Sequence, residues 1–115
     1  MKLEDIKSVY FVGIGGIGMS ALARYFMAKG KQVAGYDRTP TELTRSLEQE
    51  GAQIHYEEGV EQIPEAYRYA ENTLVVYTPA IPKEHAELTY FRAHGFEIQK
   101  RAQVLGLITR SSKGL

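Results

Sequence analysis

Apolar residues gather in five short runs along this chain, and the segments between the runs carry apolar residues at helical spacing. The runs are rich in valine, isoleucine and aromatic residues, a composition typical of β-strands. They predict strands at 8–13, 32–37, 52–56, 73–78 and 96–99. The first and fourth runs contain no charged residue, which predicts central parallel strands buried on both faces.

Helices are predicted at 19–29, 40–50, 83–93 and 101–109, so strands and helices alternate along the chain. A chain of 115 residues is long enough for one domain with a single modest core. The alternation predicts an α/β fold, a Rossmann-like open parallel sheet of about five strands with helices on both faces.

Two of these helices carry more detailed predictions. In the second, Thr39 is the expected N-cap and Pro40 the first helical residue, with Glu42 completing a capping box. The inward-facing stripe of the first helix is expected to consist of Ile17, Ala21, Leu22 and Phe26.

A glycine-rich stretch joins the first predicted strand to the first predicted helix. Gly13, Gly15 and Gly18 match the pattern G-x-G-x-x-G in the strand-to-helix setting that the pattern requires. Such glycines permit a tight turn, close approach of the backbone to a pyrophosphate, and close packing of helix on strand. A helix N-terminus adds unpaired N–H groups and a partial positive charge. The stretch therefore predicts a phosphate-bearing ligand.

Three further places along the chain are candidates for contact with that ligand. Asp37 ends the second strand, 19 residues after the last glycine of the pattern, where a dinucleotide-binding fold carries its ribose-binding carboxylate. It could equally be a turn residue before the next helix. Thr78 and Ala80 follow the fourth strand and face the ligand if it binds beyond the carboxyl ends of the strands; otherwise they only close a loop. Arg101 and Gln103, just past the last strand, could reach the same cleft.

Composition excludes several classes of partner and site. Basic and acidic residues balance at 14 each, so nucleic acid and anionic membrane surfaces are not expected partners. The absence of cysteine excludes disulfides and thiolate zinc sites from these residues. No apolar stretch approaches the ~20 residues of a membrane span, and a cytoplasmic protein is expected.

Catalytic groups are not evident in the sequence. His55, His85 and His94 are scattered, and each is expected at the surface or at a helix end. There is no acid–base pair, no partnered nucleophile and no G-x-x-x-x-G-K-[ST] phosphate loop. The chain is therefore expected to bind a ligand, with no catalytic residue and no metal site of its own.

Four segments, in order, resemble the Mur ligase family. They are Gly13–Ser20 with its Gly-Met-Ser end, Asp37 at the end of the second strand, Thr78–Ile81 against the family's Ser/Thr-x-Ala-Ile, and Gln99–Leu105 against its Gln-Arg-Ala-x-x-Leu. The resemblance covers essentially the whole chain. Within the family it is strongest to the ligase that joins L-alanine to UDP-N-acetylmuramate. One departure is His85-Ala86-Glu87, which stands where the family often has Asn-Pro-Glu.

The resemblance implies a three-domain, ATP-dependent ligase of peptidoglycan biosynthesis, and hence of cell-wall growth, cell shape and cell division. Such an enzyme activates the substrate carboxylate as an acyl phosphate, which the amine of L-alanine then attacks. This chain would be the first domain, which holds the UDP end of UDP-N-acetylmuramate. ATP and magnesium would belong to a second domain beyond residue 115 and the amino acid to a third, so the chain alone is expected to bind and not to catalyse.

The resemblance also implies a set of UDP-binding residues. The backbone of the glycine loop would hold the diphosphate, Asp37 would face the uridine, and the loop after the fourth strand would line the other side. The implied residues are Gly13, Gly15, Gly16, Ile17, Gly18, Met19, Ser20, Asp37, Thr78, Ala80, Ile81, Arg101 and Gln103.

Three alternatives share parts of this pattern. The ligase that joins a tripeptide to muramyl sugars during wall recycling would have a similar first domain. An NAD-binding domain of a dehydrogenase, or of a potassium-transport regulator, shares the glycine pattern and the acidic residue that ends the second strand.

Overall fold

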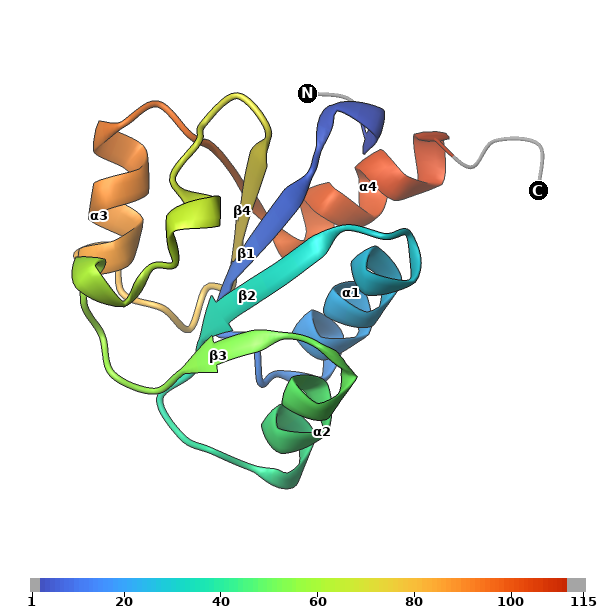
Figure 1. The fold of residues 1–115 in the computed structure, drawn as a ribbon. Helices are drawn as coiled ribbons and strands as arrows, with labels where there is room; N and C mark the ends of the chain where they lie inside the picture. Colours follow the sequence, from blue (N-terminus) through green and yellow to red (C-terminus); the bar gives the residue numbers. More distant parts are fainter. Residues whose placement is uncertain (1–2, 112–115) are drawn as a thin grey trace.

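Five parallel strands form one sheet in the order β3-β2-β1-β4-β5 in the computed structural model, which describes residues 3–111 (Figure 1). Each neighbouring pair is parallel, so the predicted Rossmann-like sheet is confirmed. The strands are β1 (Ser8–Val12), β2 (Gln32–Tyr36), β3 (Gln53–His55), β4 (Thr73–Tyr77) and β5 (Glu97–Lys100).

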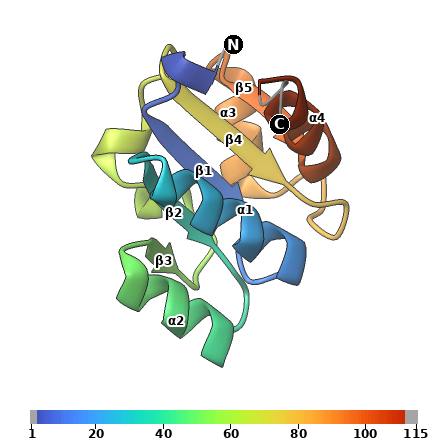
Figure 2. The same ribbon diagram turned by 90° about the vertical axis from the view of Figure 1, so that its right-hand side faces the viewer.

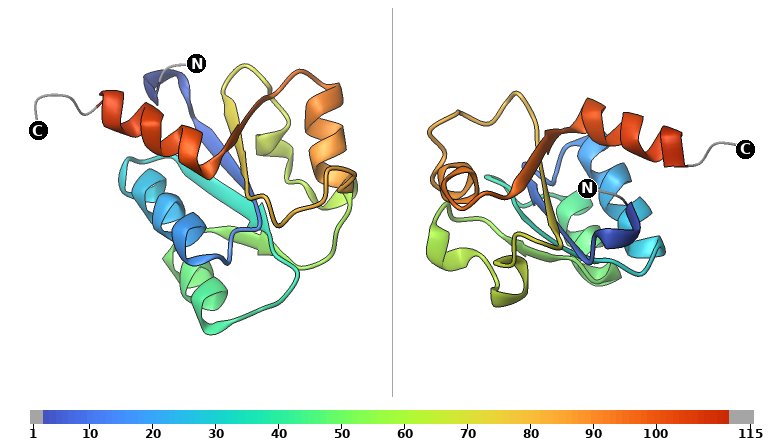
Figure 3. Two further views of the ribbon diagram at one scale, coloured as in Figure 1. Left: turned by 180° about the vertical axis from the view of Figure 1, so that it is seen from behind. Right: turned by 90° about the horizontal axis from the view of Figure 1, so that it is seen from above.

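Helices cover both faces of the sheet, as the sequence predicts. They are α1 (Ile17–Ala28), α2 (Glu42–Glu50), α3 (Ala86–Ala93) and α4 (Arg101–Ser111), with short 3-10 turns η1 (Leu3–Asp5), η2 (Val60–Gln62) and η3 (Glu65–Tyr67). Figure 3, left, views the face that carries α1, α2 and α4, whereas α3 and the turns η2 and η3 lie on the opposite face (Figures 1 and 2).

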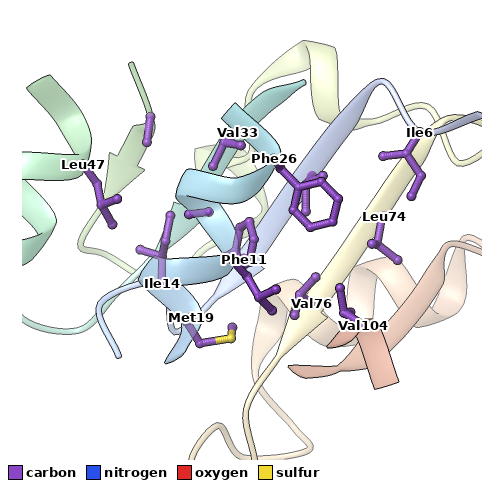
Figure 4. Close-up of a cluster of buried hydrophobic side chains, with 14 residues drawn as sticks. Ile6, Phe11, Ile14, Met19, Phe26, Val33, Leu47, Leu74, Val76 and Val104 are labelled. Atoms are coloured by element: carbon purple, nitrogen blue, oxygen red, sulfur yellow. The ribbon is translucent and has the colours of Figure 1, made fainter. Parts of the chain in front are cut away.

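The central strand β1 contributes to two hydrophobic cores because its side chains alternate between the faces of the sheet. Val9 and Phe11 pack in the core under α1 and α4, which Figure 4 shows around Phe11, Phe26 and Val76. Tyr10 and Val12 pack on the other face, in the core under α3. Every residue of β1 is buried, which confirms the prediction of a central strand.

The buried stripe of α1 differs from the predicted one. Leu22 and Phe26 are buried as predicted, but Ala21 is exposed and Ile17 is 86% exposed. The side chains that face the sheet are instead Met19, Leu22, Ala23 and Phe26. These four have i, i+3, i+4, i+7 spacing, which places them on one helical face, whereas Ile17 and Ala21 lie outside that face.

The start of α2 lies two residues later than predicted. Thr41 is the N-cap, and its hydroxyl accepts a hydrogen bond from the Thr44 N–H at 3.1 Å. The Thr44 hydroxyl in turn accepts from the Thr41 N–H at 2.8 Å, so a threonine takes the place of the expected glutamate in the capping box. Gly51, at φ +119°, ends the helix directly after residue 50, the predicted last residue.

None of the helices within residues 3–111 is both long enough and apolar enough to span a lipid bilayer.

Candidate functional site

A cleft of about 420 Å³ opens at the carboxyl ends of β1, β2 and β4. Strands β1 and β4 are neighbours in the sheet, but the chain proceeds from them toward opposite edges, which makes this the position where open α/β sheets bind ligands. The cleft is lined by Gly13, Gly16, Tyr36, Asp37, Arg38, Glu58, Thr78, Ala80, Ile81, Pro82 and His85. A second hollow, of about 570 Å³, lies at the amino ends of β2 and β3 and contains none of the predicted site residues.

The glycine loop is held in a conformation that glycine permits. Gly13 has φ +97°, a left-handed backbone that other residues rarely adopt. The N–H groups of Gly13 and Ile14 both donate to the carbonyl of Tyr36, at 2.8 and 3.0 Å, which fixes the loop to the end of β2. These two hydrogen bonds therefore define the shape of the loop.

The N-terminus of α1 leaves backbone donors beside the cleft. Its N-cap, Gly16, has no side chain to cap the helix. Within residues 3–111, no group accepts a hydrogen bond from the N–H groups of Ile17, Gly18 and Met19. Unpaired N–H groups and the positive end of the helix dipole together favour an anion at this position.

Asp37 is both a turn residue and a cleft residue. One carboxylate oxygen accepts from the Gly15 N–H at 2.7 Å, and the other accepts from the Thr39 N–H at 3.1 Å. A Cβ on Gly15 would lie 2.6 Å from the carboxylate, so only glycine permits this approach. Each carboxylate oxygen can accept a further hydrogen bond, which leaves Asp37 able to bind a hydroxyl group.

Arg101 reaches the glycine loop from the far end of the chain. It is the first residue of α4, and its side chain crosses Gly18 so closely that a Cβ there would lie 2.8–3.0 Å from it. No carboxylate of the described residues 3–111 forms an ion pair with Arg101. An exposed cation therefore lies next to the N-terminus of α1.

Of the remaining predicted residues, some line the cleft and others do not. Thr78, Ala80 and Ile81 line the cleft, and the Thr78 hydroxyl accepts from the Ala80 N–H at 3.2 Å, so this segment also closes its own turn. Ser20 is buried, and its hydroxyl donates to the Ile17 carbonyl at 2.9 Å. Gln103 accepts from the Lys100 N–H at 2.7 Å and so caps α4. The structure therefore does not bring the side chains of Ser20 and Gln103 into the cleft.

One histidine, His55, contradicts the prediction that all three lie at the surface or at helix ends, whereas His85 and His94 lie at the two ends of α3. His94 is exposed at the end of α3. The side chain of His55, in contrast, is only 15% exposed. That of His85 is 3% exposed, although it does cap the start of α3, where Nδ1 accepts from the Glu87 N–H at 3.2 Å. This cap also explains why α3 begins at Ala86 and not at residue 83.

Several cleft residues were not predicted: Tyr36, Arg38, Glu58, Pro82 and His85. Tyr36 ends β2 and His85 caps α3, far apart in the sequence, yet their ring centroids are 4.8 Å apart. Burial, and then the negative charge of Glu58, raises the pKa of Tyr36 above its usual value. The one indication in the sequence that any of these residues lines the cleft is that Tyr36 and Arg38 flank Asp37, which was predicted to do so.

A buried carboxylate lies behind the cleft. Glu87 is fully buried, and Tyr10 donates its hydroxyl hydrogen to Oε1 at 2.5 Å. The other oxygen, Oε2, lies 2.8 Å from His55 Nε2 and accepts from the Gly59 N–H at 3.1 Å. Three partners from β1, β3 and the following loop thus compensate for the burial of the carboxylate.

Replacing Tyr10 with phenylalanine tests the contribution of this network to stability. Tyr10→Phe keeps the packing but removes one donor from a buried carboxylate, so we expect a loss of about 1–2 kcal/mol at pH 7. Urea unfolding measures it, with the exposed Tyr69→Phe as a control that should stay near wild type. Equal stability of Tyr10→Phe and wild type would contradict the network's role.

The same variant should also alter the alkaline stability profile. Burial, and then the charge of Glu87, raises the pKa of Tyr10 well above its usual range, and burial raises that of Tyr67 to about 12. A tyrosine in the unfolded chain ionises near pH 10. Above that pH, Tyr10 therefore stays protonated in the folded state and is ionised in the unfolded state. The stabilisation is present below about pH 10 and is lost as the pH rises further, and Tyr10→Phe should reduce that loss.

Comparison with known families gives one match. A model described as "Mur ligase family, catalytic domain" matches residues 8–113. Similar proteins include a UDP-N-acetylmuramate–L-alanine ligase of Parabacteroides distasonis, 64% identical over all of this chain, and one of Flavobacterium johnsoniae, 54% identical over 97% of it. The chain spans about a quarter of the length of both relatives (25%).

Solved structures agree with this match. The UDP-N-acetylmuramate–alanine ligase of Thermotoga maritima superposes with a TM-score of 0.80 and 29% identity, covering 92% of this chain and 23% of that one. A murein peptide ligase of Psychrobacter arcticus gives 0.78 at 23% identity, covering 92% and 21%. At that lower identity the likeness shows the fold alone.

Proposed function

Because the chain belongs to the Mur ligase family, we propose that its cleft binds the UDP end of UDP-N-acetylmuramate. In this proposal the chain is one domain of an ATP-dependent ligase that joins L-alanine to the substrate's carboxylate in peptidoglycan biosynthesis. The protein would act in the cytoplasm, where nucleotide-activated precursors are made. The observation that carries the proposal is the juxtaposition of the uncapped α1 N-terminus with Arg101 beside the cleft.

The proposed contacts follow from the chemistry of the site. Phosphate oxygens would accept from the N–H groups of Ile17, Gly18 and Met19, which lack other acceptors within residues 3–111. Arg101 would add a charge-assisted hydrogen bond to the same diphosphate. Asp37 would accept from a ribose hydroxyl while holding the Gly15 N–H. The segment Thr78–Ile81 would form the facing wall.

Residues of this chain do not fit the ATP and magnesium that such a reaction needs. The sequence has no G-x-x-x-x-G-K-[ST] motif. The part of the chain that the structure describes contains no cluster of three histidine, cysteine or carboxylate side chains that could hold a metal ion. We therefore assign to this chain substrate binding and no step of phosphoryl transfer.

The biosynthetic ligase is favoured over the recycling ligase by sequence. The relatives that are 64% and 54% identical are both named as L-alanine ligases, whereas the recycling-type structure is 23% identical and has a similar fold. The family match likewise favours a ligase over the nicotinamide-binding and potassium-transport alternatives.

Amide chemical shifts test the proposal directly. The ¹⁵N-labelled chain would be titrated with UDP-N-acetylmuramate, UDP and NAD in separate experiments. We expect saturable shifts at Gly15–Ser20, Asp37 and Thr78 with both UDP ligands. Gly30 and Gly51, which lie at the other hollow, should not shift and serve as internal controls. Shifts with NAD alone, or no shift with any ligand, would contradict the proposal.

A further inference from the structure

We infer that His85 and Glu58 together bind the polar edge of the nucleotide's base and select uracil over cytosine. This inference rests on the proposed function, because it assumes that the cleft holds a pyrimidine nucleotide. Both residues line the cleft. Neither belongs to the glycine loop or to the segments through which the sequence resembles its family, and His85 stands at a position where this chain departs from it.

His85 presents a buried hydrogen-bond donor that has no partner. Its Nδ1 accepts from the Glu87 N–H at 3.2 Å, so the proton of the neutral ring is on Nε2. Nε2 therefore points away from the backbone of α3. It is buried and lacks a hydrogen-bond partner among residues 3–111. An unsatisfied buried donor destabilises the folded state, and a ligand that supplies an acceptor would remove that penalty.

Glu58 presents an acceptor next to this donor. One oxygen, Oε2, accepts from the Ala86 N–H at 2.7 Å, which anchors the carboxylate at the start of α3. The other, Oε1, lies 3.8 Å from His85 Nε2, which is too far for a hydrogen bond. The side chain of Glu58 is 45% exposed. Small rotations can therefore open the space between the two groups to a ligand.

A second set of hydrogen bonds holds the His85 donor and the Glu58 acceptor in position relative to each other. The buried carboxylate of Glu87, on α3, accepts from the N–H of Gly59, the residue that follows Glu58. Glu58 in turn accepts from α3 through Ala86. These reciprocal bonds join the loop after β3 to the first turn of α3, so the two polar groups are positioned before a ligand binds. Such preorganisation favours specificity over adaptability.

The pairing edge of uracil matches this arrangement. Uracil carries a ring N–H between two carbonyl oxygens, so the Nε2–H of His85 can donate to a carbonyl while Glu58 accepts from the neighbouring N–H. In cytosine the equivalent ring nitrogen is an acceptor, and it would face the Glu58 carboxylate with no hydrogen between them. A site built for one hydrogen-bonding pattern rejects the ligand that leaves its polar groups unpaired.

The test compares UDP with CDP on the 115-residue chain and on three variants. His85→Asn keeps an N-cap for α3, since asparagine is a favoured cap, but removes the Nε2–H. Glu58→Gln can still accept from Ala86 and turns a donor toward the base. Glu57→Gln, an exposed neighbour outside the cleft, makes the same charge change and is the matched control. Calorimetry or amide shifts report the affinities.

Wild type and Glu57→Gln should bind UDP at least about tenfold more tightly than CDP. His85→Asn and Glu58→Gln should each weaken UDP binding about tenfold, because each loses one hydrogen bond to uracil. His85→Asn should leave CDP binding within about twofold, whereas Glu58→Gln should bind CDP more tightly than wild type does, because its amide N–H can donate to the ring nitrogen of cytosine. Equal affinity of the wild type for UDP and CDP, with shifts at the glycine loop for both, would overturn the inference and leave the proposed phosphate site intact. If neither nucleotide binds, the proposed function fails and the inference fails with it.

Discussion

The variant Gly35→Ala is expected to lose about 3 kcal/mol of folding free energy, the upper part of the range for overpacking a core. Gly35 lies in β2 and pairs with Phe11 of β1 in the parallel ladder. A Cβ at this position would lie 2.5 Å from the Phe11 carbonyl oxygen and 3.1 Å from the side chain of Ile14. The oxygen belongs to the central strand and cannot move aside without distorting the sheet, so the strain persists in the folded state.

Urea unfolding followed by circular dichroism measures this effect. Gly30→Ala is the control, because a Cβ there meets nothing within 4 Å and is strained only by its φ of +80°, which costs about 1 kcal/mol. The two variants differ in crowding and not in the chemical change. A Gly35→Ala variant as stable as Gly30→Ala would show that β1 and β2 can separate to admit the methyl group, contrary to the expected strain.

Local sequence pattern is sufficient to predict most of the fold. The uncharged runs form β1 and β4, because a strand with helices on both faces of the sheet is central and needs apolar side chains on both sides. Gly51 ends α2 because the chain there needs a positive φ. The errors are also local in origin. Thr39 and Thr41 are both plausible caps, and only the Thr44 hydroxyl decides between them.

Some residues of the candidate site could be predicted from the local sequence and others could not. Asp37 and Thr78 could be predicted because the carboxyl ends of parallel strands meet at one edge of a sheet. His85 and Glu58 could not, because their proximity depends on how the loop after β3 docks on α3. The hydrogen bond from Tyr10 to Glu87 likewise joins residues 77 positions apart. No periodicity or spacing encodes such contacts, since they form only when the two faces of the sheet are packed.

Arg101 is the predicted residue whose role the structure makes most testable. It follows β5, yet its guanidinium lies against Gly18 at the start of α1. We expect Arg101→Ala to weaken UDP binding by about 10- to 100-fold, because a hydrogen bond to a charged group contributes about 1.5–3 kcal/mol. The affinity of Arg101→Ala for UDP should also depend less on salt than that of wild type. The variant has lost an exposed cation, and salt screens the attraction between such a cation and the diphosphate.

Lys100→Ala is the matched control for this prediction. It removes the same charge from the adjacent residue, whose side chain lines a different hollow with Lys83 and Arg92. Titration with uridine, which carries no phosphate, separates a phosphate contact from a general loss of the cleft: Arg101→Ala should alter the affinity for UDP and not that for uridine. If both variants weaken UDP binding equally, the effect is one of net charge, and the assignment of Arg101 to the diphosphate is wrong. If only Arg101→Ala does so, the last helix of the chain completes the phosphate site that the first helix begins.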